Sequence, residues 1–273
     1  MRFAIALLLM AALGSAALAQ DPNDALPNEI VAAQLPGHRI SGLVTHQHGA
    51  GHFTRGIALF PGHPGIMRLR TEDNRIKYEQ RGNFLVRSRG YWLDGETLTV
   101  TIDAPDDQWG SFAQRFRATP RYGEDVGALL AAVEAKFGKL EWTFVGTSEG
   151  SISAFHAARM LPGRVAGVIL TSSVFTAGRN GPGLADADWQ ALKTPLLWVH
   201  HESDPCNWTR YADAQQHARL TSAPLVTVRG GGPWRGDACQ AFSAHGYAGI
   251  EQKVVSAMRD WVRTRAAPES VSD

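Results

Sequence analysis

The sequence has little cysteine. Only Cys206 and Cys239 occur among its 273 residues. A structural zinc site normally needs three or four closely spaced cysteine and histidine ligands, which two cysteines far apart do not supply. The histidines His46, His48 and His52 cluster near one another, but the sequence around them offers no clear further ligand. We therefore expect no metal site.

The sequence also lacks an excess of positive or negative charge, and it lacks long hydrophobic runs. Lys and Arg total 27 and Asp and Glu total 26, which gives a formal net charge of +1. Nucleic-acid-binding domains normally carry a basic excess, so no nucleic-acid partner is expected. The most extended apolar run, residues 4–13, is too short to span a bilayer comfortably. With no internal repeat or low-complexity tract, the chain suits one globular domain of ordinary size.

The N-terminus has the features of a secretory signal. A basic residue, Arg2, precedes the apolar run, and small residues follow it up to Ala17-Leu-Ala19, an Ala-x-Ala cleavage pattern. We expect residues 1–19 to be removed and the protein to be exported from a bacterial cell to the periplasm or the medium. No cysteine follows the cleavage site, which argues against a lipid anchor. In an exported protein an isolated pair of cysteines more often forms a disulfide than two free thiols.

The most informative stretch is residues 142–151, Trp-Thr-Phe-Val-Gly-Thr-Ser-Glu-Gly-Ser. Its apolar start, residues 142–145, predicts a buried strand, and a helical pattern follows its end. Between them Gly146, Ser148 and Gly150 form Gly-x-Ser-x-Gly. In a strand–turn–helix context this motif strains the serine and exposes its hydroxyl above the sheet, while the glycines let strand and helix approach closely. Ser148 is therefore predicted to be a nucleophile, and a glycine-rich turn with a serine helix cap is the alternative.

Strands and helices alternate along the chain. Apolar or alternating runs predict strands at residues 40–47, 53–60, 98–103, 165–170, 196–200 and 225–228. Helical spacing predicts helices at residues 83–92, 123–137, 151–161, 211–220 and 250–262. This alternation implies a mostly parallel sheet covered by helices on both faces. Ligands of such sheets bind beyond the carboxyl ends of the strands, and Ser148 is predicted to lie at such an end.

The remaining segments set the domain boundaries. Residues 48–51 are predicted to join the first two strands as a hairpin. Residues 20–37 are spaced by prolines and are predicted to form an N-terminal arm. The small, polar residues 266–273 are predicted to be a disordered tail. We therefore expect one folded domain over residues 20–265.

With this motif at its centre and its elements in this order, the chain resembles the α/β-hydrolase superfamily over nearly the whole mature sequence. The resemblance implies the α/β fold of that family, a mostly parallel central sheet with helices on both faces. Relatives often insert a lid domain between the two strands that follow the nucleophile. Here residues 171–195 fill that place, which is too short a segment for a large lid.

The resemblance also implies a catalytic triad, because the family places its nucleophile, acid and histidine in that order. The strand Leu-Leu-Trp-Val-His precedes Asp204, the expected acid, with Glu202 as the neighbouring alternative. His201 replaces a glycine that the family often has three residues before the acid. His245 lies in Ser-Ala-His-Gly-Tyr directly before the last helix, where the histidine is expected. His245 would take the proton of Ser148, and Asp204 would fix the tautomer of His245.

Two backbone N–H groups would stabilise the oxyanion that forms during acyl transfer. By the resemblance, one belongs to Glu149, the residue after the nucleophile. The other comes from the segment Phe-Pro-Gly-His-Pro-Gly at residues 60–65, where His63 is the expected donor and Gly62 the alternative. Pro64 has no N–H to donate.

Two further features concern the surroundings of the triad. Cys206 follows Asp204 closely and Cys239 shortly precedes His245, so a disulfide between them would brace both loops. Three tryptophans fall in loops predicted at the catalytic edge and are candidates for lining an apolar substrate cleft: Trp109, Trp208 and Trp234.

These features predict an exported serine hydrolase that cleaves carboxylic esters through a Ser-His-Asp triad and an acyl-enzyme intermediate. The preference for esters over amides follows from the activities common in the family and not from a particular residue. The alternatives are a serine peptidase or amidase acting on short peptides, and a non-catalytic binding protein on the same fold. The expected substrate is a small-molecule or polymeric ester, no cofactor is expected, and the sequence sets no oligomeric state.

Overall fold

The computed structural model describes residues 21–179 and 181–273. The predicted signal peptide, residues 1–19, lies outside these described residues. No helix within them is both long and apolar enough to cross a membrane.

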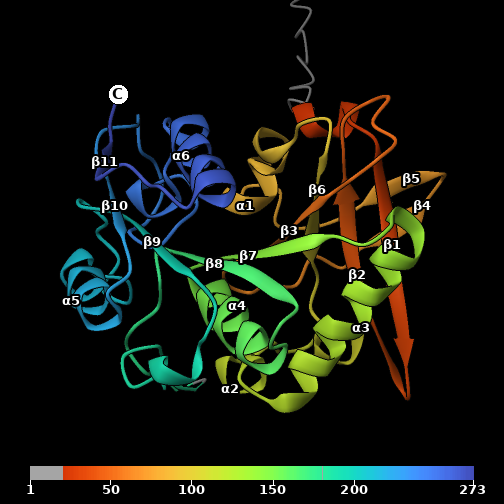
Figure 1. Ribbon diagram of the computed structural model, residues 1–273, viewed down its shortest axis with the longest axis horizontal. Coiled ribbons are helices and arrows are strands. Elements are labelled where there is room, and N and C mark those ends of the chain that lie inside the picture. Colours follow the sequence, from red (N-terminus) through yellow and green to blue (C-terminus); the bar gives the residue numbers. More distant parts are fainter. Residues whose placement is uncertain (1–20, 180) are drawn as a thin grey trace, which may run out of the picture.

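The centre of the molecule is a twisted sheet, for which the described residues supply nine strands (Figure 1). Across the sheet the strands follow the order β1 (Asn28–Leu35), β2 (His38–Thr45), β6 (Thr97–Ile102), β3 (Arg55–Phe60), β7 (Glu141–Thr147), β8 (Val165–Thr171), β9 (Leu196–His201), β10 (Leu225–Val228) and β11 (Ser270–Val271). The β1–β2 and β2–β6 pairs are antiparallel, and every later pair is parallel. A separate short ribbon contains β4 (Arg70–Glu72) and β5 (Arg75–Lys77). The predicted α/β fold class is confirmed.

Helices cover both faces of this sheet (Figure 1). One face carries α1 (Phe84–Arg87) and α6 (Glu251–Thr264), and the other carries α2 (Gln114–Arg117), α3 (Pro120–Phe137), α4 (Glu149–Met160) and α5 (Tyr211–Thr221). Short 3-10 helices lie in the loops: η1 (Pro22–Ala25), η2 (Arg89–Trp92), η3 (Asp106–Gln108), η4 (Trp189–Ala191) and η5 (Ala244–Gly246). This arrangement leaves the carboxyl ends of the parallel strands to the connecting loops.

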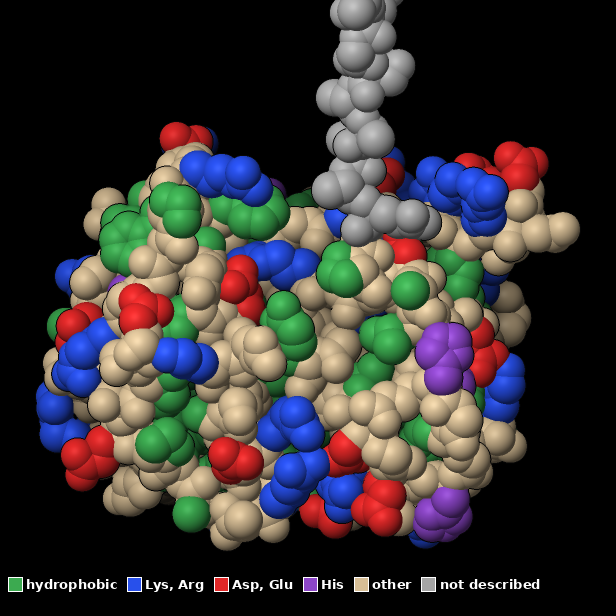
Figure 2. All heavy atoms as spheres, turned by 90° about the horizontal axis from the view of Figure 1, so that it is seen from above, with side chains coloured by type: hydrophobic (Ala, Val, Ile, Leu, Met, Phe, Trp, Pro, Cys, Tyr) green, Lys and Arg blue, Asp and Glu red, His purple; other side chains and the backbone are tan. Residues whose placement is uncertain are grey.

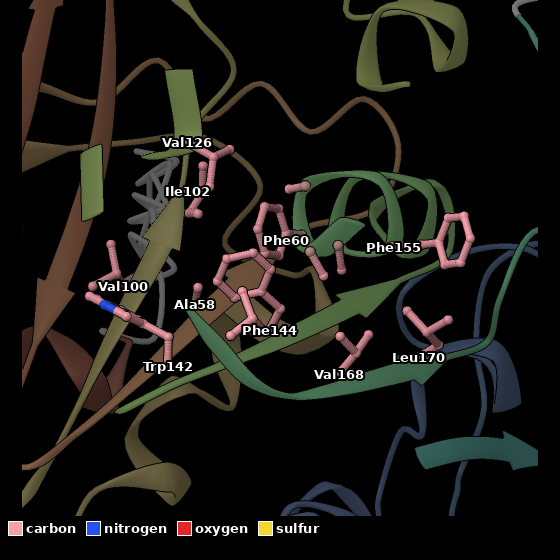
Figure 3. Close-up of a cluster of buried hydrophobic side chains, with 14 of the residues drawn as sticks. Ala58, Phe60, Val100, Ile102, Val126, Trp142, Phe144, Phe155, Val168 and Leu170 are labelled. Carbon is pink, nitrogen blue, oxygen red and sulfur yellow. The ribbon is translucent and has the colours of Figure 1, made fainter. Parts of the chain in front are cut away.

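The core consists of two apolar layers, because successive residues of a strand point to opposite faces of a sheet. In β3, Ala58 and Phe60 pack against α3 and α4, whereas Ile57 and Leu59 pack against α6. In Figure 3 Phe60 lies beside Phe144 of β7, and their ring centroids are 5.1 Å apart. The strands that carry the predicted nucleophile are therefore buried on both sides, which holds their ends rigidly.

Charged side chains of both signs are interspersed on the face shown in Figure 2, as expected from a net charge near zero. One arginine, in contrast, is fully buried. Arg89 donates to Asp21 Oδ2 at 3.0 Å, to the Val86 carbonyl at 2.8 Å and to the Tyr78 hydroxyl at 2.9 Å. Asp21 thus supplies the counter-charge of a buried cation and ties the start of the described chain to the domain.

Several predictions about individual segments were wrong. Within the expected N-terminal arm, residues 28–35 form β1, which pairs along its whole length with β2. The expected hairpin does not exist, since β6 lies between β2 and β3. The expected helix at residues 83–92 is broken at Ser88 into α1 and η2. In the tail that was expected to be disordered, β11 pairs with β10.

The connection between β8 and β9 was predicted to lack a large lid, and this is confirmed. Residues 172–179 and 181–195 contain only η4 and an isolated bridge between Gly178 and Gly181. The carboxyl ends of β7 and β8 are therefore not covered by an inserted domain.

Candidate active site

Ser148 occupies the sharp turn between β7 and α4. Its backbone lies at φ 53° and ψ −128°, a region that residues other than glycine rarely adopt. A Cβ on Gly146 would lie 2.3 Å from the Gly150 carbonyl oxygen, and one on Gly150 would lie 1.9 Å from the Phe60 carbonyl oxygen. Both glycines are thus required for the close approach of strand and helix, as the motif predicts.

Replacing Gly150 with alanine is expected to lower the free energy of unfolding by about 1–3 kcal/mol, because the added methyl group overlaps the backbone of β3. The measurement is urea denaturation of the wild type and the variant. Gly110→Ala is the matched control, since a Cβ there meets nothing within 4 Å and the residue needs no positive φ. Equal stability of Gly150→Ala and Gly110→Ala would contradict the described turn.

The Ser148 side chain faces a cavity of about 1200 Å³. Its walls come from the loops after β3, β7, β8, β9 and β10 and from the start of α1. Beside Ser148, it is lined by other residues singled out in the sequence, among them His63, Glu149, Trp208 and His245, and by the disulfide cysteines. The cavity therefore brings together segments that are more than 180 residues apart in the sequence.

A hydrogen bond joins the predicted base and acid. His245 Nδ1 and Asp204 Oδ2 are 3.0 Å apart, and the Asp204 side chain is completely buried. The Cys206 N–H donates to Asp204 Oδ1 at 2.9 Å, and the Thr209 hydroxyl donates to Oδ2 at 2.8 Å. Because Nδ1 is the donor to this carboxylate, Nε2 is left as the basic nitrogen of a neutral His245.

The alternative acid and the neighbouring histidines are engaged elsewhere. Glu202 is hydrogen-bonded to Arg229 on the surface at 2.9 Å. His200 is fully buried and accepts from the Ser173 N–H, and burial lowers its pKa to about 3. His201 Nε2 contacts the Gly230 carbonyl oxygen at 2.9 Å. Among the candidates considered, His245 is therefore the histidine that lines the cavity with a carboxylate, Asp204, bound behind it.

The loop of residues 61–65, called the 61–65 loop below, lies directly beside the serine. A Cβ on Gly62 would lie 2.9 Å from Ser148 Cβ. Gln80 Nε2 donates to the His63 carbonyl at 2.8 Å, and Arg117 donates to the Pro64 carbonyl at 2.9 Å. The loop is thus fixed by side chains from two other segments. No local sequence pattern marks Gln80 or Arg117 for this role.

Glu149 connects this loop to the turn that contains Ser148. Its carboxylate contacts His63 Nδ1 at 3.3 Å and the buried Arg117 at 3.3 Å, and it accepts from Gln114 at 3.1 Å. Burial opposes the charge of Glu149, but the hydrogen bond with His63 and the charge of Arg117 outweigh it and lower the pKa of this carboxyl. The same hydrogen bond raises the pKa of His63. The negative charge of the Glu149 carboxylate is therefore stabilised by Arg117 and by the hydrogen bond with His63.

The structure contains the predicted disulfide between Cys206 and Cys239. Both cysteines line the cavity, and the bond connects the loop after β9 to the loop that precedes η5. Since the Cys206 N–H also donates to Asp204, the disulfide restrains a residue that is hydrogen-bonded to the predicted acid.

Removing this bond with the double substitution Cys206→Ser and Cys239→Ser is expected to lower the free energy of unfolding by about 2–4 kcal/mol. Turnover should also fall at temperatures where the protein is still folded, because both loops gain freedom. A thiol count on the denatured, unreduced wild type tests the bond, and kinetics below the melting range test its effect on turnover. Two free thiols would refute the bond, and unchanged turnover would restrict its role to stability.

The three tryptophans are placed differently. Trp208 lines the cavity and is 45% exposed. Trp109 is hydrogen-bonded to the Ala104 carbonyl and packs against the core, and Trp234 stands edge-on to His201. Neither Trp109 nor Trp234 is among the residues that line the cavity, so Trp208 is the one in position to contact a ligand there.

Comparison with solved structures places this architecture among known folds. Est1E from Butyrivibrio proteoclasticus matches with a TM-score of 0.57 at 12% identity, over 86% of this chain and 97% of that one. A CIB-like hydrolase from Thermoplasma acidophilum matches with a TM-score of 0.54 at 13% identity, over 87% of this chain and 99% of that one. The chain has the α/β-hydrolase fold.

This α/β-hydrolase fold also matches part of a larger enzyme. The acylaminoacyl peptidase from Pyrococcus horikoshii matches with a TM-score of 0.53 at 12% identity, over 87% of this chain but 41% of that one. No protein-family model matches the sequence, and no curated protein is similar to it in sequence. At these identities the comparisons show the fold, and any activity has to be argued from the site.

Proposed function

We propose that this protein is an exported serine hydrolase that cleaves carboxylic esters, with Ser148 as nucleophile, His245 as base and Asp204 as acid. The observation that carries the proposal is the buried Asp204–His245 hydrogen bond on the wall of the cavity that the strained Ser148 faces. A strained serine turn combined with an oriented histidine is what nucleophilic acyl transfer needs.

In the proposed reaction, Ser148 Oγ bonds to the carbonyl carbon of the ester while its proton passes to His245 Nε2. The π electrons of the carbonyl move onto its oxygen, which the backbone N–H groups of Glu149 and His63 stabilise. When this oxyanion collapses, the bond to the alcohol oxygen breaks and His245 gives that oxygen its proton. A water molecule then repeats the sequence on the acyl-enzyme and releases the acid.

The form of the cavity supports small-molecule or polymeric esters as substrates. No lid domain covers the site in the part of the chain that the structure describes, so a bulky acyl or alcohol group can extend outward. The predicted signal sequence and the disulfide support export to the periplasm or the medium.

A hydrolytic assay with p-nitrophenyl esters of increasing acyl length, run beside the corresponding p-nitroanilides, tests the reaction class. We expect ester cleavage with a saturable rate and stoichiometric labelling of Ser148 by a fluorophosphonate probe, mapped by mass spectrometry. Cleavage of anilides or short peptides without ester cleavage would favour the peptidase or amidase alternative. Absence of both labelling and turnover would favour a binding protein on the same fold.

A further inference from the structure

Asn83 lies on the wall of the cavity, immediately before α1. Its Oδ1 accepts a hydrogen bond from the Leu85 N–H at 3.0 Å, which makes Asn83 the N-cap of that helix. Because the two ends of an amide point in different directions, this cap fixes where the other end points. Nδ2 must face away from α1.

The distance from Asn83 Nδ2 to the serine can be bounded from the surroundings of Gly62, which lies between them. A Cβ on Gly62 would lie 3.6 Å from Asn83 Nδ2 and 2.9 Å from Ser148 Cβ. Both distances are measured from the same Cβ position on Gly62. The distance between Asn83 Nδ2 and Ser148 Cβ therefore cannot exceed the sum of the two. A group bonded to Ser148 Oγ extends from that Cβ into the cavity, which Asn83 also lines. An acyl oxygen there can thus come within hydrogen-bonding distance of the amide.

The donor is also free for this purpose. Throughout the described part of the chain, the hydrogen bond of the Asn83 side chain is the one made by Oδ1, and the two N–H bonds of Nδ2 have no acceptor. A donor with no protein partner, held by its own cap at the edge of a cavity, is preorganised for a ligand.

We propose that Asn83 is a further catalytic residue, which donates from Nδ2 to the oxyanion of the tetrahedral intermediate. The inference rests on the proposed function and adds a third, side-chain donor to the N–H groups of Glu149 and His63. When Ser148 Oγ adds to the carbonyl carbon and the π electrons move onto the oxygen, a neutral amide strengthens its hydrogen bond without any proton transfer. Gly62 leaves the space between the amide and the serine open.

The cap makes a sharp experiment possible, since serine and aspartate also accept N-cap hydrogen bonds. Asn83→Ser keeps the cap but lacks a donor that reaches the oxyanion, and Asn83→Asp adds a carboxylate that repels it. We expect kcat for a p-nitrophenyl ester to fall about 10²-fold to 10³-fold in Asn83→Ser and at least as far in Asn83→Asp. KM should change by only a few-fold, and thermal unfolding should stay close to that of the wild type.

The inhibition constant of a compound that forms a tetrahedral adduct provides a second measurement. This constant would not change if Asn83 had only a structural role. A trifluoromethyl ketone forms such an adduct with a catalytic serine, so its inhibition constant should weaken in Asn83→Ser by about the same factor as kcat/KM. The melting temperatures of both variants are recorded in parallel. If Asn83→Ser and Asn83→Asp keep kcat and inhibition constants within about three-fold of the wild type, Asn83 is only a cap and the inference is overturned.

Failure of the inference and failure of the proposed function give different results. Wild type and Ser148→Ala are measured in the same assay. A wild type that is no more active than Ser148→Ala overturns both proposals. An activity that depends on Ser148 but not on Asn83 overturns the inference alone.

Discussion

Ser148→Ala is expected to abolish ester hydrolysis and labelling by a fluorophosphonate while leaving the fold intact. Members of a catalytic triad act as a unit, and loss of the nucleophile in serine hydrolases costs about 10⁴-fold to 10⁶-fold in kcat. The substitution removes one oxygen from a side chain that faces the cavity, so thermal unfolding should change little. His245→Ala is expected to be equally damaging, since His63, the other histidine that lines the cavity, is hydrogen-bonded to Glu149 and not to a buried aspartate.

Ser111→Ala serves as the matched control, because Ser111 is exposed and does not line the cavity. It should keep full activity and labelling. Labelling that persists in Ser148→Ala and maps to another serine would show that the nucleophile has been assigned wrongly.

Asp204→Asn is expected to lower kcat by about 10⁴-fold, as the equivalent change does in a serine protease. The aspartate accepts from His245 Nδ1, from Thr209 and from the Cys206 N–H. An asparagine amide presents a donor in place of one of these acceptors, which favours the wrong tautomer of His245. Steady-state kinetics and a pH–rate profile measure the loss.

Glu202→Gln is the control for this assignment, since Glu202 is the neighbouring carboxylate and is bound to Arg229 on the surface. It should have near-normal turnover. The opposite pattern, an inactive Glu202→Gln and a near-normal Asp204→Asn, would move the acid by two positions.

The strands at the centre of the sheet could be predicted from the sequence because they are buried on both faces. Such strands appear as continuous apolar runs, and β7, β8 and β9 agree with the predicted runs to within two residues. The edge strand β1 has no such signal, since it is partly exposed and flanked by prolines. The false hairpin arose because adjacency in the sequence was taken as adjacency in the sheet, where β6 intervenes.

The residues of the site likewise include some that the sequence could predict and some that it could not. Ser148 has a local motif, and Asp204 and His245 have a fixed order relative to it in the family, so sequence could propose all three. Arg117 and Gln80 act through contacts with the 61–65 loop, which lies far from them in the chain. No local pattern marks such contacts. Asn83 has a readable capping signal, but the direction of its amide depends on the fold.

The burial of Arg89 would limit where the predicted signal peptide can be cleaved. Its counter-ion Asp21 lies two residues beyond the predicted cleavage site after Ala19. A leader peptidase that cut a few residues later would remove Asp21 and leave a buried cation without its closest anion, which is costly for a folded protein. If the predicted leader is removed, its cleavage position would be constrained by folding on the mature side as well as by the small residues before the predicted site.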